Sequence, residues 1–508
     1  LSNRAPVEPL ATGGFRRGSG GLVTALLTVA EATGADWVAA ARTPTERHLA
    51  NARQTLVQER DGAPPMRIHF VDSGRSAYEQ HYSVICNPLL WFLQHYLWDL
   101  SYEPVVDGRT HRAWSNGYAK VNQDLADEVV RVTASNPRRP LILVQDYQLY
   151  LAPARIRAGV PHAVLQQFVH IPWPEPHYWR VLPAQFRNAI IDGLVSNDIV
   201  GFQTPHDVAN FLATCEELRG LRVDHRDQVV LSRGRLAWAR AYPISVDTDN
   251  LERLSRSGDV RQMESDIRGG RDEQLIVRVD RLDPAKNIIR GFLAYERLLL
   301  QNPPLRGRVG FFAFLQPSRQ DVAAYRAYGQ AVQATVERIN NRFGRDGWRP
   351  IRLEMGESQR RAMAAFRSYD VLLVNSILDG MNLVAKEGAV VNQRDGVIVL
   401  SESTGAHQEL GEAAVSVNPF DVEMTAAALR LALTMAAPER ARRAAVLRQV
   451  VVERDIARWV RLQLQDLHDL IGPVVPPGAR TVRSPRAGRR RAGRSLRRRR
   501  GQPRSSPH

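Results

Sequence analysis

Short apolar runs recur along the first half of the chain, and each is followed by polar residues and then by a stretch with helical spacing. Such uninterrupted runs are typical of parallel strands that are buried on both faces. The clear runs in this half lie at residues 141–144, 163–169 and 199–202. The alternation of strand and helix signals predicts an α/β fold, with a doubly wound sheet over residues 1–243.

A second alternation begins after Tyr242 and Pro243, which we interpret as a domain boundary. Its predicted strands lie at residues 275–279, 309–315, 351–355, 371–374, 397–400 and 414–417. We therefore predict a second doubly wound domain over residues 244–455, followed by an amphipathic helix over residues 456–471. Pro, Gly, Ser and Arg dominate residues 472–508, so we predict a disordered basic tail there.

Polar side chains follow the predicted strands of the first domain. Asp146 and His170 each come after such a strand, and open parallel sheets bind ligands at these carboxyl ends. A single Asp or His there is usually a cap or a satisfied structural group, but several converging strand ends favour a site. A glycine-rich loop with Gly20 and Gly21 precedes a helical stretch, which favours phosphate, although flexible linkers have a similar composition.

Arg281 and Lys286 bracket a predicted helix start in the second domain. Asp283-Pro284 lies between them, and Pro is tolerated in the first turn of a helix because its missing N–H has no partner there anyway. Two cations at a helix amino terminus oppose the helix dipole, so helix stability does not explain them. An anionic ligand such as a pyrophosphate would resolve this conflict.

The segment from Asp379 to Glu387 joins a predicted strand to a helix through a tight turn at Gly380. The first N–H groups of such a helix lack partners in the chain and lie at the positive end of its dipole, so they favour a phosphate. Carboxylates beside a phosphate site often hold sugar hydroxyls. Alternatively, Asp379 caps the helix and Glu387 is an ordinary surface residue. The residues alone leave both interpretations open.

The net charge of +16 comes mostly from the end of the chain. Twelve Arg lie between Arg480 and Arg504, and no Asp or Glu follows Asp469, so the remaining body is only mildly basic. Such a tail could bind nucleic acid or another acidic surface. It lacks the interleaved aromatic residues that stack on bases, and we favour a disordered, non-catalytic extension.

Cys86 and Cys215 are the only cysteines, which indicates no disulfide framework and fits a reducing cytoplasm. No Cys or His cluster has metal-ligand spacing. The aromatic-rich segment at residues 82–98 also contains Pro and polar residues, so we predict a buried helix there and no membrane span. The chain begins at Leu1 without a leader pattern, so we predict no signal peptide. Whether the first strand, which would end at Ser2-Asn3-Arg4, is complete stays open.

Taken in order, the motifs at the strand ends resemble those of glycosyltransferase family 20, the retaining α,α-trehalose-phosphate synthases. The resemblance extends from Ser2 to about residue 470. The motifs that carry it are Gly20-Gly21-Leu22, Asp146-Tyr147, His170-Ile171-Pro172, Gly201-Phe202-Gln203-Thr204, Arg281-Leu282-Asp283 with Lys286, Pro317-Ser318-Arg319, Asp379 to Glu387, Leu400-Ser401-Glu402 and Val417-Asn418-Pro419-Phe420-Asp421. Each motif is short, and the evidence lies in their joint order and spacing.

The resemblance implies a GT-B type fold, in which two Rossmann-like domains face a cleft and the final helix crosses back to the first domain. It implies a nucleotide-sugar donor, usually UDP-glucose, in the second domain. It implies glucose 6-phosphate as acceptor, bound mainly by the first domain. Members of the family retain the anomeric configuration without an obvious protein nucleophile, so Asp146 is not assigned as one. Neither a cofactor nor a metal is implied.

The resemblance also implies roles for particular residues. At the reacting centre it places Asp146, His170, Arg281, Lys286 and Asp379. The residues that would bind the donor are Gly20, Gly21, Arg281, Lys286, Asp379, Gly380, Met381, Asn382, Leu383, Val384 and Glu387, the last on the ribose hydroxyls. The residues that would bind the acceptor are Arg4, Tyr82, Trp91, Asp146 and Arg319, with Arg4, Tyr82 and Arg319 on its phosphate. Without the resemblance, Tyr82 and Trp91 would be interpreted as core residues.

The chain departs from the usual family pattern at several positions. Gln145 and Gln148 flank Asp146-Tyr147 where His is usual, and Leu378 stands where Arg is usual. These departures leave two alternatives open. One is the same donor chemistry with another acceptor, as in glucosylglycerol-phosphate synthases or pseudo-glycosyltransferases, and the other is a catalytically silent regulatory protein. The donor base and the oligomeric state, including a homo-oligomer, also stay open.

Overall fold

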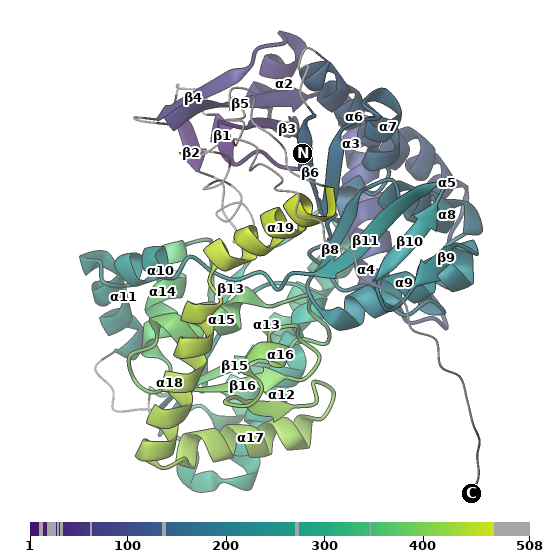
Figure 1. Ribbon diagram of the computed structural model, residues 1–508. Helices are drawn as coiled ribbons and strands as arrows, with labels where there is room; N and C mark the ends of the chain where they lie inside the picture. The colour runs from purple at the N-terminus through teal and green to yellow at the C-terminus, as the bar shows by residue number, and fades with distance from the viewer. Residues whose placement is uncertain are drawn as a thin grey trace, which may run out of the picture.

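The structure is a computed structural model that describes residues 1–9, 14–17, 27, 30, 34–60, 63–134, 139–269, 274–345 and 347–471. The predictions for Gly20, Gly21 and the tail at residues 472–508 lie outside the described residues. In Figure 1 the purple and blue elements form one domain and the green elements form a second. The two halves of the sequence pattern therefore correspond to two bodies in space.

The described part of the first domain contains three sheets. Its strands are β1 (Val7–Pro9), β2 (Phe15–Arg17), β3 (Asp36–Ala40), β4 (Leu56–Arg60), β5 (Ala63–Val71), β6 (Leu141–Gln145), β7 (Val164–Phe168), β8 (Ile199–Phe202), β9 (Arg222–Asp224), β10 (Val229–Ser232) and β11 (Arg235–Ala241). One sheet has the order β6-β7-β8-β11-β10-β9, another has the order β3-β5-β4, and β1 pairs with β2. Strands β6, β7, β8 and β11 are parallel.

Helical segments connect and cover these strands. They are α2 (Pro44–Asn51), α3 (Arg75–Glu79), the π-helix η1 (Gln80–Trp91), α4 (Phe92–Gln94), α5 (Gly108–Ala113), η2 (Trp114–Ala119), α6 (Lys120–Thr133), η3 (Tyr147–Leu149), α7 (Ala152–Gly159), η4 (Tyr178–Val181), α8 (Ala184–Leu194) and α9 (Pro205–Arg219). Strands β7 and β8 are buried along their whole length, as expected for strands covered on both faces. The buried helix predicted at residues 82–98 corresponds to η1 and α4.

The first residues of the chain join the two larger sheets of the first domain. The amino group of Leu1 donates to the carbonyl oxygen of Leu143 at 2.8 Å, and the N–H of Ser2 donates to that of Val38 at 3.1 Å. Ser2 makes a single parallel β-bridge to β3, where the sequence predicted a strand. This bridge lies between β3 and β6, so Arg4 emerges at the carboxyl edge of both sheets.

The second domain is built on one sheet of six parallel strands in the order β14-β13-β12-β15-β16-β17. These strands are β12 (Gln274–Arg281), β13 (Val309–Gln316), β14 (Ile351–Met355), β15 (Val371–Val374), β16 (Val397–Ser401) and β17 (Val415–Val417). This is the Rossmann order, in which the strand sequence reverses between the first and the fourth strand. The loops after β12 and β15 diverge at that point and leave a crevice at the carboxyl edge.

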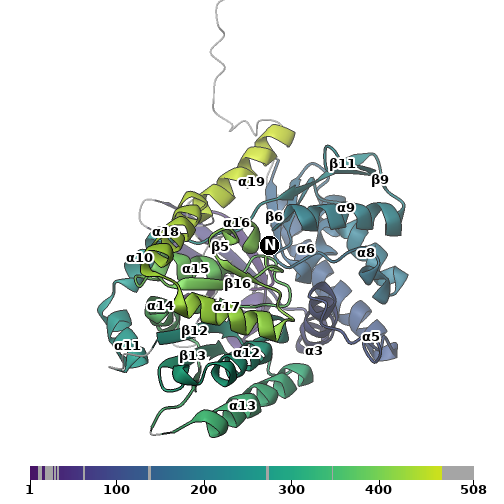
Figure 2. The ribbon, with the colours of Figure 1, turned by 90° about the horizontal axis from the view of Figure 1, so that it is seen from below.

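Alternate residues of this sheet enter two separate cores. Along β15, Val371 and Leu373 belong to one core, while Leu372 and Val374 belong to the other. The helices of the domain are α10 (Thr248–Ser255), α11 (Gly258–Arg268), η5 (Pro284–Lys286), α12 (Ile288–Gln301), η6 (Pro303–Leu305), α13 (Ala323–Phe343), α14 (Gln359–Ser368), α15 (Leu383–Val391), α16 (His407–Leu410), α17 (Val422–Thr434) and α18 (Ala437–Glu453). Figure 2 shows α12 and α13 on one side of β12 and β13, with α15 and α18 on the other.

The chain crosses between the domains at residues 242–247 and returns through α19 (Ile456–Ile471), drawn in yellow in Figures 1 and 2. On α19, Trp459 donates to the carbonyl oxygen of Tyr242 at 3.1 Å, and Gln463 accepts from Gln166 of β7 at 2.8 Å. The last helix therefore contacts the first domain. The α/β fold with two doubly wound domains is confirmed, while the domain limits that we assign stay predictions.

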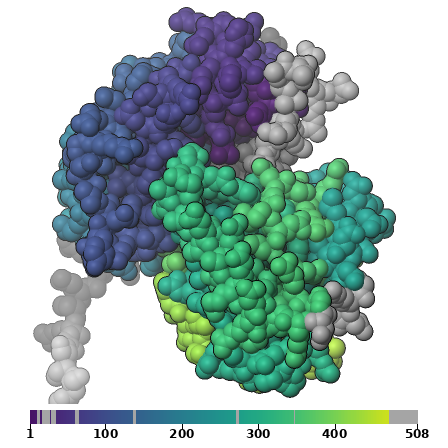
Figure 3. Space-filling view, turned by 180° about the vertical axis from the view of Figure 1, so that it is seen from behind, coloured from purple at the N-terminus to yellow at the C-terminus, as the bar shows by residue number. Residues whose placement is uncertain are grey.

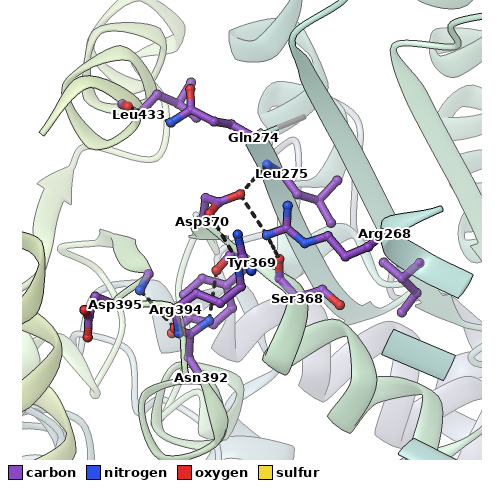
Figure 4. Close-up of polar contacts among 12 residues, drawn as sticks. Arg268, Gln274, Leu275, Ser368, Tyr369, Asp370, Asn392, Arg394, Asp395 and Leu433 are labelled. Atoms are coloured by element: carbon purple, nitrogen blue, oxygen red, sulfur yellow. Dashed lines mark hydrogen bonds and ion pairs between the residues drawn. The ribbon is translucent and has the colours of Figure 1, made fainter. Parts of the chain in front are cut away.

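Asp370 joins the central strands of the second sheet at the edge opposite their carboxyl ends (Figure 4). Its carboxylate accepts from the N–H of Leu275 at 2.8 Å and from Arg268 at 2.9 Å. Its own N–H donates to the carbonyl oxygen of Leu275 at 2.9 Å. The amino ends of β12 and β15 are therefore fixed by side-chain bonds, and their carboxyl ends are left to form the crevice.

Candidate active site

A cleft of about 490 Å³ lies between the domains, at the carboxyl edges of their central strands. Figure 3 shows the domains as two lobes, with the first in purple and blue and the second in green. The first domain lines the cleft with Ser2, Asn3, Arg4, Trp37, Tyr82, Trp91, His95, Gln145, Asp146, Tyr147, Gln148, His170, Ile171 and Gln203. The other lining residues are Ile244, Arg281, Lys286, Gln316, Arg319, Asp379, Met381, Asn382 and Leu383. The cleft thus brings together most of the residues that the sequence singled out.

Lys286 and Asp379 form an ion pair where the strand order of the second sheet reverses. Lys286 closes η5 after β12, and Asp379 lies in the turn between β15 and α15. The ammonium of Lys286 donates to Asp379 Oδ2, which also accepts from Asn382 Nδ2 at 3.0 Å. Burial alone would raise the pKa of Asp379, but Lys286 outweighs that effect and holds the pKa below its usual value. Asp379 is therefore ionised and holds Lys286 at the crevice.

Asn382 is the N-cap of α15, which decides between the two interpretations of this turn. Its Oδ1 accepts from the N–H of Ala385 at 3.2 Å, and its backbone has a φ of 76°. The alternative in which Asp379 caps the helix is therefore wrong. Gly380 lies against the first domain, because a Cβ added to it would lie 2.3 Å from the carbonyl oxygen of His170. Only glycine allows this close contact between the domains.

Two arginines that the sequence assigns to different substrates lie over one indole ring. The guanidinium carbons of Arg281 and Arg319 are 5.1 Å and 3.8 Å from the ring centroid of Trp91. Asp283 Oδ2 lies 3.9 Å from Arg281 and 3.1 Å from Arg319, and the Asp283 side chain is fully buried. One ring and one carboxylate therefore position both cations. The predicted helix start differs in detail, since Asp283 caps the 3₁₀ turn η5 and α12 begins only at Ile288.

Arg4 and Tyr82 lie on the first-domain side of the cleft. An Arg4 guanidinium N–H donates to the Tyr82 hydroxyl at 3.3 Å. Burial alone would raise the pKa of Tyr82, but Arg4 and Arg319 outweigh it and hold this pKa below its usual value. The lowered pKa of Tyr82 indicates a positive electrostatic potential at this place in the cleft, which suits a phosphate group.

Asp146 has a strained backbone at the end of β6. Its φ of 72° and ψ of 177° fall in a region that residues other than glycine rarely adopt. Its N–H donates to the carbonyl oxygen of Phe168 at 2.7 Å, and its Oδ1 accepts from the N–H of His170 at 3.1 Å. Burial raises the pKa of Asp146 to about 6. Neighbouring strand ends thus fix one carboxylate in the cleft, with its charge sensitive to pH near neutrality.

We expect the acceptor kcat/KM to rise with pH through about 6, because only the ionised Asp146 accepts bonds from sugar hydroxyls on both oxygens. Asp146→Asn should lose this pH dependence of kcat/KM and most of the activity.

A second prediction concerns the stability of the fold. The folded-state pKa of Asp146 is raised, so the protonated form is favoured in the fold and the free energy of unfolding falls as pH rises through about 6. Asp146→Asn should therefore be more stable than the parent at pH 8, by about 1–3 kcal/mol, and the difference should shrink at pH 4. Thermal unfolding across pH measures it, and a constant difference would contradict the assignment.

His170 follows β7 and lies against the second domain. Its Nε2 is 3.0 Å from Gln145 Oε1, and its Nδ1 is 3.4 Å from Gln203 Nε2. Burial lowers the pKa of His170 to about 3, so the ring is neutral at physiological pH. Gln145, which departs from the usual family pattern, therefore takes part in holding this ring.

Some of the predicted donor residues lie elsewhere. Val384 and Glu387 follow on α15 and are absent from the described residues that line the cleft. Burial raises the pKa of Glu387 to about 7. Gly20 and Gly21 lie outside the described residues, so the structure does not place the glycine-rich loop. Gly380 is also absent from the lining, although it lies beside it. The roles assigned to these five residues, and those assigned to the residues that do line the cleft, stay predictions.

Asp283 and Gln203 had no predicted role, although both stand in motifs at the predicted strand ends. Asp283 could have been noticed as the acidic residue between two cations at a helix start. Gln203 carried no signal of this kind, because its contacts come from a different strand and from the interdomain crossing. Tyr82 and Trp91 were interpreted either as core residues or as acceptor-binding residues. Trp91 is buried in the core, and both residues also line the cleft.

No group of three or more metal-ligating side chains occurs among the residues that the structure describes. Within the same residues, none of the helices has the length and apolar character needed to cross a membrane. Neither observation tests the expectation that no cofactor or metal is needed, which stays a prediction.

Comparison with known proteins gives consistent results. A family model for glycosyltransferase family 20 matches residues 8–469. The trehalose-6-phosphate synthase of Mycobacterium marinum is 32% identical over 484 residues, which are 92% of this chain and 93% of that protein. A bifunctional trehalose-6-phosphate synthase/phosphatase of Thermoproteus tenax is 32% identical over 475 residues, and the match spans 62% of its length.

Solved structures agree with the sequence relatives. An α,α-trehalose-phosphate synthase (UDP-forming) from Burkholderia xenovorans, in complex with glucose-6-phosphate, has a TM-score of 0.78 at 30% identity, over 92% of this chain and 99% of that chain. An E. coli trehalose-6-phosphate protein bound with UDP-2-fluoro glucose has a TM-score of 0.78 at 29% identity, over 88% of this chain and 96% of that chain.

The structure has two Rossmann-like domains that face a shared cleft, and cations lie where the second sheet reverses its strand order. This arrangement defines a glycosyltransferase of the GT-B type. The family match and the relatives narrow this class further. The chain belongs to glycosyltransferase family 20.

Proposed function

We propose that this enzyme transfers glucose from UDP-glucose to glucose 6-phosphate with retention of configuration, giving α,α-trehalose 6-phosphate and UDP. One observation carries the proposal, which is that one cleft brings together two sets of cations. Arg281 and Lys286 form the first set at the reversal point of the second sheet, and Arg4 and Arg319, with the hydroxyl of Tyr82, form the second. The relatives solved with glucose-6-phosphate and with UDP-2-fluoro glucose support the same pair of substrates.

On the donor side the cations stabilise the departing diphosphate. The bond between the anomeric carbon and the phosphate oxygen breaks, so negative charge develops on the diphosphate. Lys286 and Arg281 lie at the crevice where this charge appears, and both are held there by carboxylates. The amino end of α15 adds its unpaired N–H groups.

On the acceptor side the phosphate fixes the direction of the sugar. With its phosphate on Arg4, Tyr82 and Arg319, the acceptor would extend its anomeric hydroxyl toward Asp146 and the donor sugar. That oxygen attacks the anomeric carbon from the face that the diphosphate leaves, and the hydroxyl proton passes to an oxygen of the departing diphosphate. Asp146 binds and orients hydroxyls and forms no covalent intermediate, unlike the second carboxylate of retaining hydrolases.

The test measures nucleoside diphosphate release from UDP-glucose and from GDP-glucose, each with glucose 6-phosphate, with glycerol 3-phosphate and with no acceptor. We expect release that requires UDP-glucose and glucose 6-phosphate together and that continues when a chelator is added. Release with glycerol 3-phosphate alone would favour a different acceptor on the same donor chemistry. Donor binding without any release would favour a catalytically silent protein.

A further inference from the structure

His170 lies at the end of a chain of hydrogen bonds that reaches the interdomain crossing. Its Nδ1 is 3.4 Å from Gln203 Nε2, and Gln203 Oε1 accepts from the main-chain N–H of Ile244 at 3.0 Å. Its Nε2 is 3.0 Å from Gln145 Oε1. Gln203 is only 2% exposed, so its amide depends on these protein partners.

The direction of each hydrogen bond follows from Ile244. A main-chain N–H can only donate, so the group of Gln203 that faces Ile244 is the carbonyl oxygen. The Gln203 amide nitrogen must then face the imidazole, and because it can only donate, Nδ1 of His170 must accept. The ring proton therefore lies on Nε2 and is donated to Gln145 Oε1. The protein thus specifies one neutral tautomer of His170.

The burial of His170 also favours a neutral ring. The ring centroid of Phe168 is 4.4 Å from that of the imidazole, and the ring centroid of Trp459 is 6.3 Å from it. Burial among such groups disfavours the imidazolium form, which is why the pKa of His170 is lowered to about 3. Trp459 belongs to α19, so the returning helix forms part of this enclosure.

The charged residues near His170 are engaged elsewhere. Asp146 accepts from the main-chain N–H of His170 at 3.1 Å and makes no bond to the ring. Across the cleft, Lys286 and Asp379 are paired with each other. On α19, Asp466 accepts from the hydroxyl of a tyrosine at 2.7 Å. None of these carboxylates is bonded to the imidazole to stabilise a positive charge on it.

The main chain of Ile244 is also bonded to the second domain. The carbonyl oxygen of Ile244 accepts from Lys386 Nζ at 2.8 Å. The Lys386 side chain is 1% exposed and lies 2.5 Å from Glu409, which also pairs with Arg454 at 3.2 Å. Lys386 belongs to α15, whose amino end lies at the cleft. Ile244 is therefore bonded to His170 through Gln203 on one side and to the donor-side helix on the other.

We propose that Gln203 is a positioning residue that holds His170 as the neutral Nε2–H tautomer and ties its ring to the interdomain crossing at Ile244. This inference deepens the proposed function and rests on it for its effect on turnover. His170 consequently acts as neither acid nor base in the transfer. Its contribution is a fixed ring orientation and a carbonyl oxygen held against Gly380.

The experiment uses the full chain labelled with ¹⁵N at histidine, without substrates. The signals of His170, one of 13 histidines, are identified by their loss in His170→Gln. In the parent we expect the nitrogen shifts of a neutral ring protonated at Nε2, unchanged between pH 5 and 9. In Gln203→Glu a carboxylate oxygen replaces the amide donor opposite Nδ1, so this nitrogen should gain a proton and His170 should become imidazolium within that range.

Activity then tests the positioning role. We expect Gln203→Glu to lower kcat by about 10–100-fold, as small misplacements at a reacting centre do, with UDP affinity changed by less than about twofold. Gln166→Glu is the matched control, since Gln166 is 1% exposed in the adjoining strand β7 and contacts Gln463 rather than His170. This control should keep the parental His170 spectrum and kcat.

The spectrum and the activity separate the inference from the proposed function. A parental ring protonated at Nδ1, or one that titrates between pH 5 and 8, would overturn the inference whatever the substrates are, even if Gln203→Glu failed to fold. So would a Gln203→Glu protein with the parental spectrum and kcat. The predicted tautomer in a protein that does not use UDP-glucose and glucose 6-phosphate would instead overturn the proposed function alone.

Discussion

Lys286→Met should lower kcat/KM by about 10³-fold, the largest effect we expect from a single side chain. Removal of one preorganised group that stabilises transition-state charge typically costs 10²–10³-fold, and Lys286 has a second task as the ion-pair partner of Asp379. Without the ammonium, the cause that holds the Asp379 pKa low is lost and burial should raise it. The measurement is UDP release under steady-state conditions, together with the affinity for UDP.

The matched control for this change is Lys120→Met. Lys120 also pairs with an aspartate, Asp124, at 2.8 Å, but its side chain is 49% exposed on α6. Exposed ion pairs contribute about 0–1 kcal/mol, so activity and the unfolding temperature should stay close to those of the parent. Parental turnover in folded Lys286→Met would refute the assignment of Lys286 to the diphosphate.

Gly380→Ala should lower kcat/KM by about 10²-fold or more while the protein still folds. The added Cβ would lie 2.3 Å from the carbonyl oxygen of His170, and because that atom is backbone, the two domains must move apart locally. A displacement of this kind separates donor groups from acceptor groups, and overpacking costs about 1–3 kcal/mol of stability. Turnover and thermal unfolding of the same preparation measure both effects.

Gly258→Ala provides the comparison for Gly380→Ala. Gly258 is the first residue of α11, and a Cβ added there meets no atom within 4 Å. We expect parental activity and an equal or slightly higher unfolding temperature, because Ala restricts the unfolded chain more than Gly does. Parental activity in Gly380→Ala itself would show that the close contact with His170 is dispensable.

Strands such as β13, β15 and β16 could be predicted from the sequence because each contains a continuous apolar run, as burial on both faces requires. Strand β14 instead alternates apolar and charged residues, which fits its place at the edge of the sheet. Strand β4 (Leu56–Arg60) was not predicted, since it is mostly polar and lies at the edge of its sheet. Strand β11 (Arg235–Ala241) was also missed, because its burial is partial and two of its residues are arginines. Strand β4 is held by its hairpin partner β5, and β11 by pairing with β10 and with the more distant β8. Such pairing can form strands without an apolar pattern in their own sequence.

The candidate site could be predicted in part for a related reason. Parallel strands end at one edge, so polar residues after neighbouring strands of one sheet, such as Asp146 and His170, were expected to meet. The strained φ of 72° at Asp146 and the shared use of Asp283 by two arginines depend on tertiary contacts that no spacing encodes. Trp91 shows the same limit, since an aromatic residue in a buried helix gives no sign that two guanidiniums lie over its ring.

The central claim is that one cleft joins two glucose units at their anomeric carbons with retention. Proton NMR of the product formed from UDP-glucose and glucose 6-phosphate tests it most directly. We predict two α-anomeric signals and no reducing-end signal, as α,α-trehalose 6-phosphate requires. A β-anomeric signal from the transferred glucose, or a product that keeps a reducing end, would contradict the account.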